Sequence, residues 1–246
     1  MIRTGVIAAG LALLAQSATA VDCRTEPFEG ARYTICEVDA ATETLELFLY
    51  GEDGAPLGQF SNINRALASK NLQLVFAMNA GMYHDNRAPV GHYVEDGREV
   101  MRVIESAGPG NFGLLPNGVF CLREGRADVF ETSAFVASAP DCEDATQSGP
   151  MLVIDGALHP RFLEDGTSKF IRNGVGTSDD GRRVVFAISD EPVNFYDFGR
   201  LFRDHLALPN ALYFDGKISR LYAPALGRSD FGFSLGPIVG VVAPSE

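Results

Sequence analysis

Polar side chains gather directly after an apolar run in the stretch Leu74–Gly91, LVFAMNAGMYHDNRAPVG. The apolar residues predict a buried strand, and the polar residues predict a loop at its end, where functional sites are often built. Gly81 would let the backbone approach a ligand. The residues expected to supply donors, acceptors and titratable groups are Asn79, Tyr83, His84, Asp85 and Arg87. The same residue types also form ordinary turns, so a polar hairpin loop is the alternative.

Three further strand ends carry polar residues beside glycine. They are Ser148-Gly149, Arg172-Asn173 and Asp215-Gly216-Lys217. If the four strand ends converge on a single cleft, that cleft offers two cations for an anionic substrate group and a carboxylate for a developing positive charge. Solvated arginines and Asp-Gly turns are common, so the alternatives are a surface residue at Arg172 and a turn residue at Asp215.

Other titratable residues are weaker candidates. His92 and His84 have the side chain suited to acid or base catalysis, although an isolated histidine is more often structural. Asp190 and Glu191 end a predicted core strand and could support the site or bind a metal. The sequence contains no nucleophile elbow, P-loop, HExxH or EF-hand motif. The commoner enzyme classes that these motifs mark are therefore excluded from the candidate functions. We expect no cofactor.

The first twenty residues have the pattern of an export signal. Arg3 precedes the apolar run Gly5–Ala15, and small residues precede the expected cleavage site after Ala20. This pattern predicts a secretory signal peptide over residues 1–20, and the run is too short to span a bilayer. We therefore expect a periplasmic or secreted protein without a membrane span, with a single domain over residues 21–246.

The net charge limits the classes of binding partner that we expect, and the cysteine content indicates the cellular compartment. The net charge of −12 disfavours nucleic acid and anionic membranes as partners, but it leaves open an anionic substrate in a locally basic pocket. Four cysteines in an exported chain favour disulfides, and of the three connectivities we expect the local one, Cys23–Cys36 with Cys121–Cys142. These cysteines are expected to be structural, so a catalytic thiol is not expected.

The apolar periodicity predicts an α+β fold with a mixed, largely antiparallel sheet and a few helices. Strands are expected at 31–38, 44–50, 73–78, 92–94, 100–104, 112–115, 118–122, 127–130, 151–154, 170–176, 183–188, 211–214, 218–222 and 231–242. Helices are expected at 61–70 and at 195–206, the second capped by Asn194. The 218–222 strand is expected to return as the hairpin partner of 211–214.

The order of these motifs resembles a known family. NAGMY, SGPML, IRNGVG, a core strand with a capped helix, and ALYFDG follow one another as in the phosphodiester glycosidase domain, the catalytic domain of the mannose 6-phosphate uncovering enzyme. The resemblance runs from about Leu45 to Val242 and implies an exported bacterial branch. In the family, the residues of these motifs line one cleft. The matching positions in this sequence, which the resemblance implies line the same cleft, are Asn79, Gly81, Ser148, Gly149, Pro150, Arg172, Gly176, Asp215 and Gly216.

The resemblance implies an exported hydrolase that cleaves the glycosidic bond of a sugar-1-phosphodiester in envelope glycan metabolism. Asp215 would act at the anomeric carbon, Arg172 first and Lys217 second would bind phosphate, and Asn79 would hold a hydroxyl or the phosphate. The expected substrate is a small-molecule or glycan phosphodiester. Substrate-binding residues are expected at Gly81, Tyr83, His84, His92, Ser148, Gly149 and Lys217.

This sequence also departs from the family pattern. Ala80 and Met82-Tyr83 replace the family's small and aromatic pair, and Lys217-Ile218-Ser219 replaces its glycine-serine end. These departures leave a second interpretation open, namely a non-catalytic periplasmic protein that binds glycan or phosphate.

Overall fold

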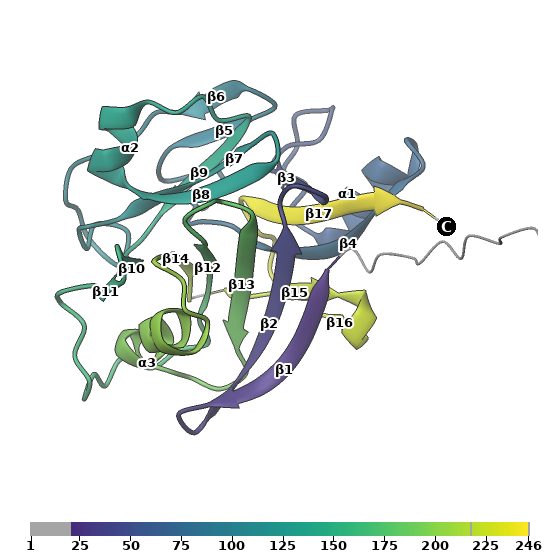
Figure 1. Ribbon diagram of the computed structural model, residues 1–246. Coiled ribbons are helices and arrows are strands. Elements are labelled where there is room, and N and C mark those ends of the chain that lie inside the picture. Colours follow the sequence, from purple (N-terminus) through teal and green to yellow (C-terminus); the bar gives the residue numbers. More distant parts are fainter. Residues whose placement is uncertain (1–20, 217, 246) are drawn as a thin grey trace, which may run out of the picture.

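The strands of the chain divide among three sheets in which every pairing is antiparallel (Figure 1). The computed structural model describes residues 21–216 and 218–245. The expected signal peptide and Lys217 therefore lie outside the described residues. The α+β class expected from the sequence is confirmed, with the strands shared by three sheets instead of one.

Two of the three sheets mix strands from distant parts of the chain, and the third is built from the consecutive strands β5 to β9 (residues 93–148). The seven-stranded sheet has the order β1 (Asp22–Phe28), β2 (Ala31–Asp39), β13 (Arg183–Ser189), β12 (Asn173–Thr177), β14 (Asn210–Asp215), β10 (Met151–Ile154) and β11 (Ala157–Leu158). One five-stranded sheet has the order β16 (Arg228–Ser229), β15 (Leu221–Ala223), β4 (Leu72–Asn79), β17 (Ile238–Pro244) and β3 (Thr44–Phe48). The other has the order β6 (Arg98–Met101), β5 (Tyr93–Glu95), β9 (Asp144–Ser148), β7 (Gly118–Arg123) and β8 (Arg126–Glu131).

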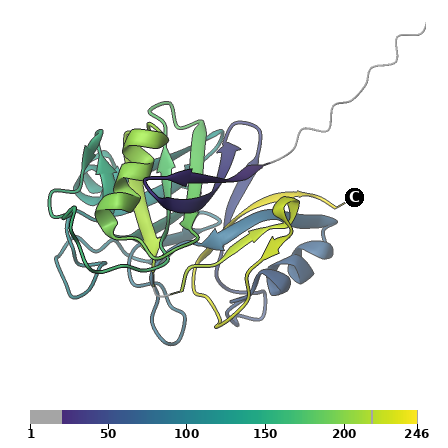
Figure 2. The same ribbon diagram turned by 90° about the horizontal axis from the view of Figure 1, so that it is seen from below.

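Each α-helix covers one sheet. Helix α1 (Phe60–Ala68) packs on β4 and β17, and α2 (Thr132–Ser138) packs on β7 and β8. Helix α3 (Phe195–Arg200) continues into the π-helical turn η1 (Leu201–His205) and packs on the seven-stranded sheet. A short 3₁₀ turn, η2 (Pro224–Leu226), follows β15. Figure 2 shows α1 and α3 at opposite sides of the molecule.

The main core lies between the three sheets. Its aromatic rings form a chain in which Phe76 of β4 contacts Phe186 of β13 at 4.8 Å between ring centres, and Phe120 of β7 lies 5.9 Å from Phe186. Phe214 of β14 lies 6.2 Å from Phe120. All four rings are 0% exposed. Because a buried phenylalanine stabilises the fold by about 2–3 kcal/mol, this chain of rings holds the ends of β4 and β14 in fixed relation.

Several local predictions are confirmed. The Asn194 side chain accepts a hydrogen bond from the Asp197 amide at 2.8 Å and caps α3. Both disulfides form as expected, Cys23–Cys36 and Cys121–Cys142. Within residues 21–216 and 218–245, no helix has both the length and the apolar character to cross a membrane.

Other predictions are wrong. Residues 221–223 do not pair with 211–214, because β12 and β10 already occupy both edges of β14; they pair with β4 instead. Residues 112–115 form a loop in which Gly113 packs on the backbone of Gly108. The expected helix 195–206 changes to π-helical geometry at Leu201. The sequence analysis did not predict β1, α2 or β9.

Candidate active site

Two buried asparagines join the ends of β4, β12 and β14. The Asn79 amide nitrogen donates to Asn173 Oδ1 at 3.3 Å, and the Asn173 side chain donates to the carbonyl oxygen of Asn79 at 3.0 Å. Asn173 Oδ1 also accepts a hydrogen bond from the backbone amide of Asp215 at 3.1 Å. Both asparagines are 0% exposed. The structure thus brings together three of the strand ends that the sequence analysis selected, and Asn79 lies beneath the site as part of its frame.

The fourth strand end meets the same frame. The Ser148 hydroxyl donates to the carbonyl oxygen of Phe214 at 2.8 Å, directly before Asp215. A β-carbon at Gly149 would lie 2.6 Å from Cβ of Asn117, and one at Gly81 would lie 2.9 Å from the Thr146 hydroxyl oxygen. These two glycines therefore permit close packing of the backbone under the site.

A cavity of about 730 Å³ opens beside Asp215. Its wall comes from the loop after β4, from the loop 109–112, and from Asp215, Ile218 and Phe233. The expected site residues Tyr83 and His84 line it. The cavity therefore combines a strand-end carboxylate with aromatic, histidine and arginine side chains on one surface.

Asp215 and Tyr83 influence each other electrostatically. Burial raises the pKa of Tyr83, and the negative charge of Asp215 raises it further, so the phenol stays protonated and can donate. Its hydroxyl donates to the carbonyl oxygen of Ser234 at 3.3 Å. The Asp215 carboxylate accepts a hydrogen bond from the Gly216 amide at 2.6 Å, which orients one of its oxygens.

Arg87 is the arginine in the cavity wall. Its guanidinium carbon lies 5.4 Å from the centre of the Tyr83 ring, and one of its nitrogens donates to the carbonyl oxygen of Asp85 at 2.6 Å. The backbone φ of Arg87 is +72°, in the left-handed region that non-glycine residues adopt at a cost. A strained residue that projects a cation into a cavity is a sign of a functional position.

Arg172 lies behind the cavity, 1% exposed and outside its described lining. Its guanidinium donates to the carbonyl oxygens of Val193 at 2.8 Å and Ser168 at 2.9 Å. Burial lowers the pKa of this guanidinium, and its interaction with the Tyr213 hydroxyl opposes that shift.

Tyr213 contacts Arg172, whose guanidinium carbon lies 5.4 Å from the centre of the Tyr213 ring. Burial raises the pKa of Tyr213, and the positive charge of Arg172 opposes that rise. The phenol also interacts with Asn111 in the cavity wall. A β-carbon at Gly216 would overlap the Tyr213 hydroxyl, so glycine leaves room for this oxygen beside Asp215. Arg172 is thus connected to the cavity through Tyr213.

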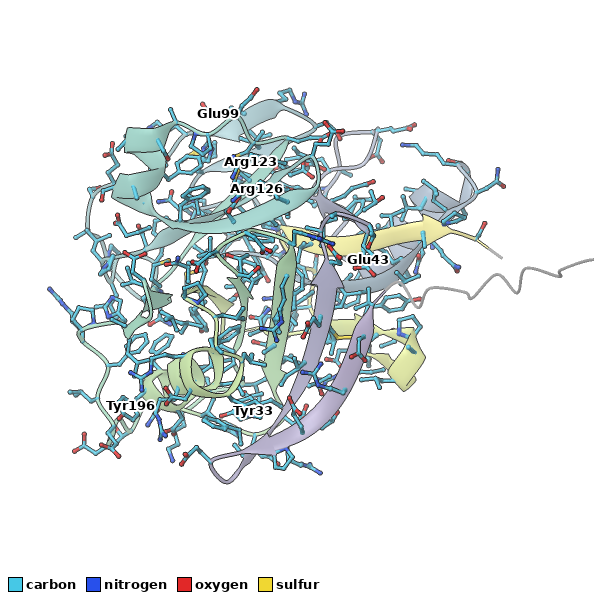
Figure 3. The ribbon with its side chains drawn as sticks, viewed as in Figure 1. Tyr33, Glu43, Glu99, Arg123, Arg126 and Tyr196 are labelled. Atoms are coloured by element: carbon cyan, nitrogen blue, oxygen red, sulfur yellow. A yellow bond between two sulfur atoms is a disulfide. The ribbon has the colours of Figure 1, made fainter. Side chains whose placement is uncertain are left out.

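His92 lies in a separate cavity of about 320 Å³. Its Nδ1 lies 3.0 Å from the carbonyl oxygen of Met101 and 3.5 Å from the Glu99 carboxylate, and burial lowers its pKa. Figure 3 shows Glu99 at the far end of the molecule from Tyr196 on α3. The structure does not bring His92 into the cavity beside Asp215.

Asp190 and Glu191 are engaged by arginines. Arg228 donates to the Asp190 carboxylate at 2.9 Å, while the Glu191 carboxylate accepts from the backbone amide of Arg32 at 2.6 Å. In the part of the chain that the structure describes, no group of three or more histidine, cysteine, aspartate or glutamate residues could hold a metal ion. The expected Lys217 lies outside the described residues.

Sequence reasoning missed Asn111, which lines the cavity, and Tyr213, which interacts with it. The loop after Asn79 and the strand end Arg172-Asn173 were selected from the sequence, and they bring Arg87 and Asn173 to the site. Nothing in the sequence marked Asn111 as a site residue beyond its position in a loop, because its position depends on a contact with Tyr213, about a hundred residues later in the chain.

Two comparisons with known proteins find similar sequences. A model of the phosphodiester glycosidase family matches residues 73–228. The uncharacterized protein YigE of Escherichia coli K12 is 34% identical over 185 residues, which cover 75% of this chain and 72% of YigE.

Solved structures share the fold. The catalytic domain of zebrafish N-acetylglucosamine-1-phosphodiester alpha-N-acetylglucosaminidase, auto-inhibited by its pro-peptide, has a TM-score of 0.61 at 12% identity, covering 93% of this chain and 85% of that one. A hypothetical protein from Synechocystis has a TM-score of 0.58 at 11% identity, covering 90% and 61%. At these identities the similarity concerns the fold alone.

Proposed function

Because the chain belongs to the phosphodiester glycosidase family, we propose that it hydrolyses the glycosidic bond of a sugar-1-phosphodiester. Cleavage of this bond develops positive charge at the anomeric carbon while the phosphate leaves as an anion. Such a reaction needs a carboxylate at the sugar, a cation at the phosphate and room for both. The observation that supports the proposal is that Asp215 and Arg87, from distant segments, line one cavity of about 730 Å³.

In this proposal Asp215 stabilises or attacks the anomeric carbon. Its position is well defined, since Asn173 accepts from its backbone amide and the Gly216 amide donates to its carboxylate. Asn79, which holds Asn173, is then a positioning residue. Ser148, Gly149 and Gly81 shape the floor on which these groups rest.

The phosphate is proposed to lie against Arg87, with His84 and Lys217 as further donors. A guanidinium binds phosphate through charge-assisted hydrogen bonds, and phosphate is a good leaving group once its charge is compensated. Arg172 is proposed to act through Tyr213, whose phenol it contacts from behind the cavity wall. An acid catalyst is then less important than for an ordinary glycoside.

We further propose that the enzyme acts outside the cytoplasm, in envelope glycan metabolism. Two disulfides support this, because disulfides persist mainly in oxidising compartments. The proposed substrate is a small-molecule or glycan phosphodiester.

The test compares two strand-end aspartates that both precede glycine, Asp215 and Asp155. On a panel of glycosyl-1-phosphodiesters, we expect Asp215→Asn to lower kcat by roughly 100-fold or more. Asp155→Asn should change it little, because Asp155 is not among the described cavity residues. Circular dichroism should show both variants folded. Near-normal kcat in Asp215→Asn would refute the role of this carboxylate, and binding without turnover in the wild type would favour a non-catalytic binding protein.

A further inference from the structure

The separate cavity of about 320 Å³ lies between the β5–β6 hairpin and the C-terminal end of helix α2. We call it the His92 cavity, because His92 forms part of its wall. Val94 of β5, Phe135 of α2 and Cys142 supply buried apolar surface, and these side chains belong to one core cluster. The cavity therefore has apolar walls that can cover the carbon body of a small ligand.

The His92 ring is held in one orientation. Its side chain is only 8% exposed, its backbone amide donates to Gln147 Oε1 at 3.0 Å, and its carbonyl oxygen accepts from the Gln147 amide at 2.8 Å. The ring packs against Phe135 at 5.3 Å between ring centres, and Nδ1 lies 3.0 Å from the carbonyl oxygen of Met101. These contacts fix the direction of the second ring nitrogen, Nε2.

The same contacts determine which ring nitrogen carries the proton. Burial lowers the pKa of His92, so the imidazole is neutral at pH 7 and has a single N–H. A carbonyl oxygen can only accept a hydrogen bond, so the proton lies on Nδ1, facing Met101, and Nε2 carries a lone pair. Among the described residues no group donates to Nε2, and this nitrogen is not fully enclosed by protein atoms. The His92 cavity therefore contains an acceptor without a donor.

The charged groups in the wall of the His92 cavity are negative. Glu99 of β6 and Asp141 contribute carboxylates, and Glu99 Oε2 lies 3.5 Å from Nδ1 of His92. The described part of the chain places no arginine or lysine in this wall, so an anion would be repelled. These three residues also form no metal-binding group, since the described residues contain none. An organic cation with N–H donors is the ligand class that fits.

We infer that the His92 cavity binds a small organic amine, whose ammonium group donates to Nε2 of His92 beside the Glu99 and Asp141 carboxylates while its carbon body packs on Phe135. An ammonium has donors and no acceptor, which complements a lone pair next to two carboxylates. The net charge of −12 also attracts cations to the protein surface. The inference does not depend on the proposed function, because the cavity beside Asp215 has a different wall.

An NMR titration with three probes of similar shape tests this inference. At pH 7 the probes phenylethylamine, phenylethanol and phenylacetate are a cation, a neutral molecule and an anion. We expect the amine to bind with a Kd of about 0.1–1 mM and the other two to bind at least about tenfold more weakly. Equal affinities for the amine and the alcohol, or no binding of the amine up to about 10 mM, would overturn the inference.

Two variants test the position of the ammonium group. His92→Asn keeps an N–H near the position of Nδ1 but removes Nε2, and it should weaken amine binding about tenfold or more. Glu99→Gln should weaken it about two- to fivefold, because this carboxylate is exposed. Glu105→Gln is the matched control, since it removes the same charge outside the cavity wall. Equal losses in Glu99→Gln and Glu105→Gln would contradict a local contact.

Nitrogen NMR of the wild-type protein observes the acceptor directly, so the test does not depend on whether His92→Asn folds. The chain contains four histidines, and the one whose ring signals shift in Glu99→Gln is assigned to His92. Nε2 should show the chemical shift of an unprotonated ring nitrogen and move upfield as phenylethylamine binds. A protonated Nε2 in the free protein, or an unchanged Nε2 shift at saturating amine, would refute the inference.

Discussion

The guanidinium carbon of Arg172 lies 3.6 Å from the centre of the Phe195 ring, a cation-π contact in the protein interior. Phe195 is the first residue of α3, and Arg172 directly precedes β12. The contact therefore joins the helix to the strand that carries Asn173. Because the same arginine also supports Tyr213, its loss should affect stability as well as activity.

We predict that Arg172→Ala lowers the free energy of unfolding by about 2–4 kcal/mol, since it removes the ring contact and the hydrogen bonds to the carbonyl oxygens of Val193 and Ser168. Urea denaturation at pH 7 measures this loss. Arg32→Ala is the control, because the Arg32 side chain is 67% exposed and its ion pair should contribute less than about 1 kcal/mol. Equal losses in the two variants would contradict the prediction.

Arg87→Gly should separate binding from stability. Removal of the guanidinium should weaken the binding of inorganic phosphate about 10- to 100-fold, because a charge-assisted contact is lost. Glycine accepts the positive φ of this position, so the protein should remain as stable or gain about 1 kcal/mol. Isothermal titration calorimetry and urea denaturation give the two readouts. Arg65→Ala, on the exposed face of α1, is the control; an unchanged phosphate affinity in Arg87→Gly would refute its role.

The pair Asn79 and Asn173 should behave as a coupled unit. Each replacement by alanine should cost about 2 kcal/mol of stability, because a buried amide or carbonyl group loses its partner. The double variant should cost less than the sum, by roughly 1 kcal/mol. A double-mutant cycle from urea denaturation measures this coupling. Strict additivity would show that the two side chains act independently.

Glu95 should make stability depend on pH. Burial raises the pKa of Glu95 to about 7, and the nearby Asp144 adds to the rise. The folded protein therefore holds a proton that the unfolded chain releases near pH 4.5. The stability that this proton contributes is complete below pH 4.5 and is lost as the pH rises through 7.

Glu95→Gln keeps the oxygen that accepts from the Leu49 amide at 3.2 Å and cannot ionise. We expect this variant to exceed the wild type in stability at pH 8 by about 1–2 kcal/mol, and the advantage to vanish near pH 4.5. Urea denaturation at the two pH values tests this, with the exposed Glu124→Gln as control. A difference that does not vary with pH would disprove the assignment.

Local signals in the sequence predicted local structure well. The Asn194 cap, the Asp96-Gly97 turn and both disulfides depend on residues close in the chain, and all are present. The convergence of the strand ends was also predictable, because core strands that end in glycine and polar residues often border one cleft.

Long-range competition was not predictable in the same way. The hairpin expected between 218–222 and 211–214 does not form, because β10 and β12 pair with both edges of β14. No local sequence pattern predicts these long-range pairings. The burial of Arg172 depends on Phe195, and an arginine in a sequence does not reveal whether an aromatic ring will cover it. Arg87 was visible as a loop cation, but only the fold shows that it faces the same cavity as Asp215.

Strand β17 lies between β4 and β3 in its sheet, although its residues come late in the chain. Ile238 is the register partner of Asn79, so the residue beneath the cavity gains this neighbour only after the chain has been synthesised through residue 238. A chain interrupted before residue 238 would leave β4 as an open strand edge, which invites aggregation and proteolysis. Quality control should therefore remove such truncated products early, and the sheet beneath the cavity is completed only once β17 has formed.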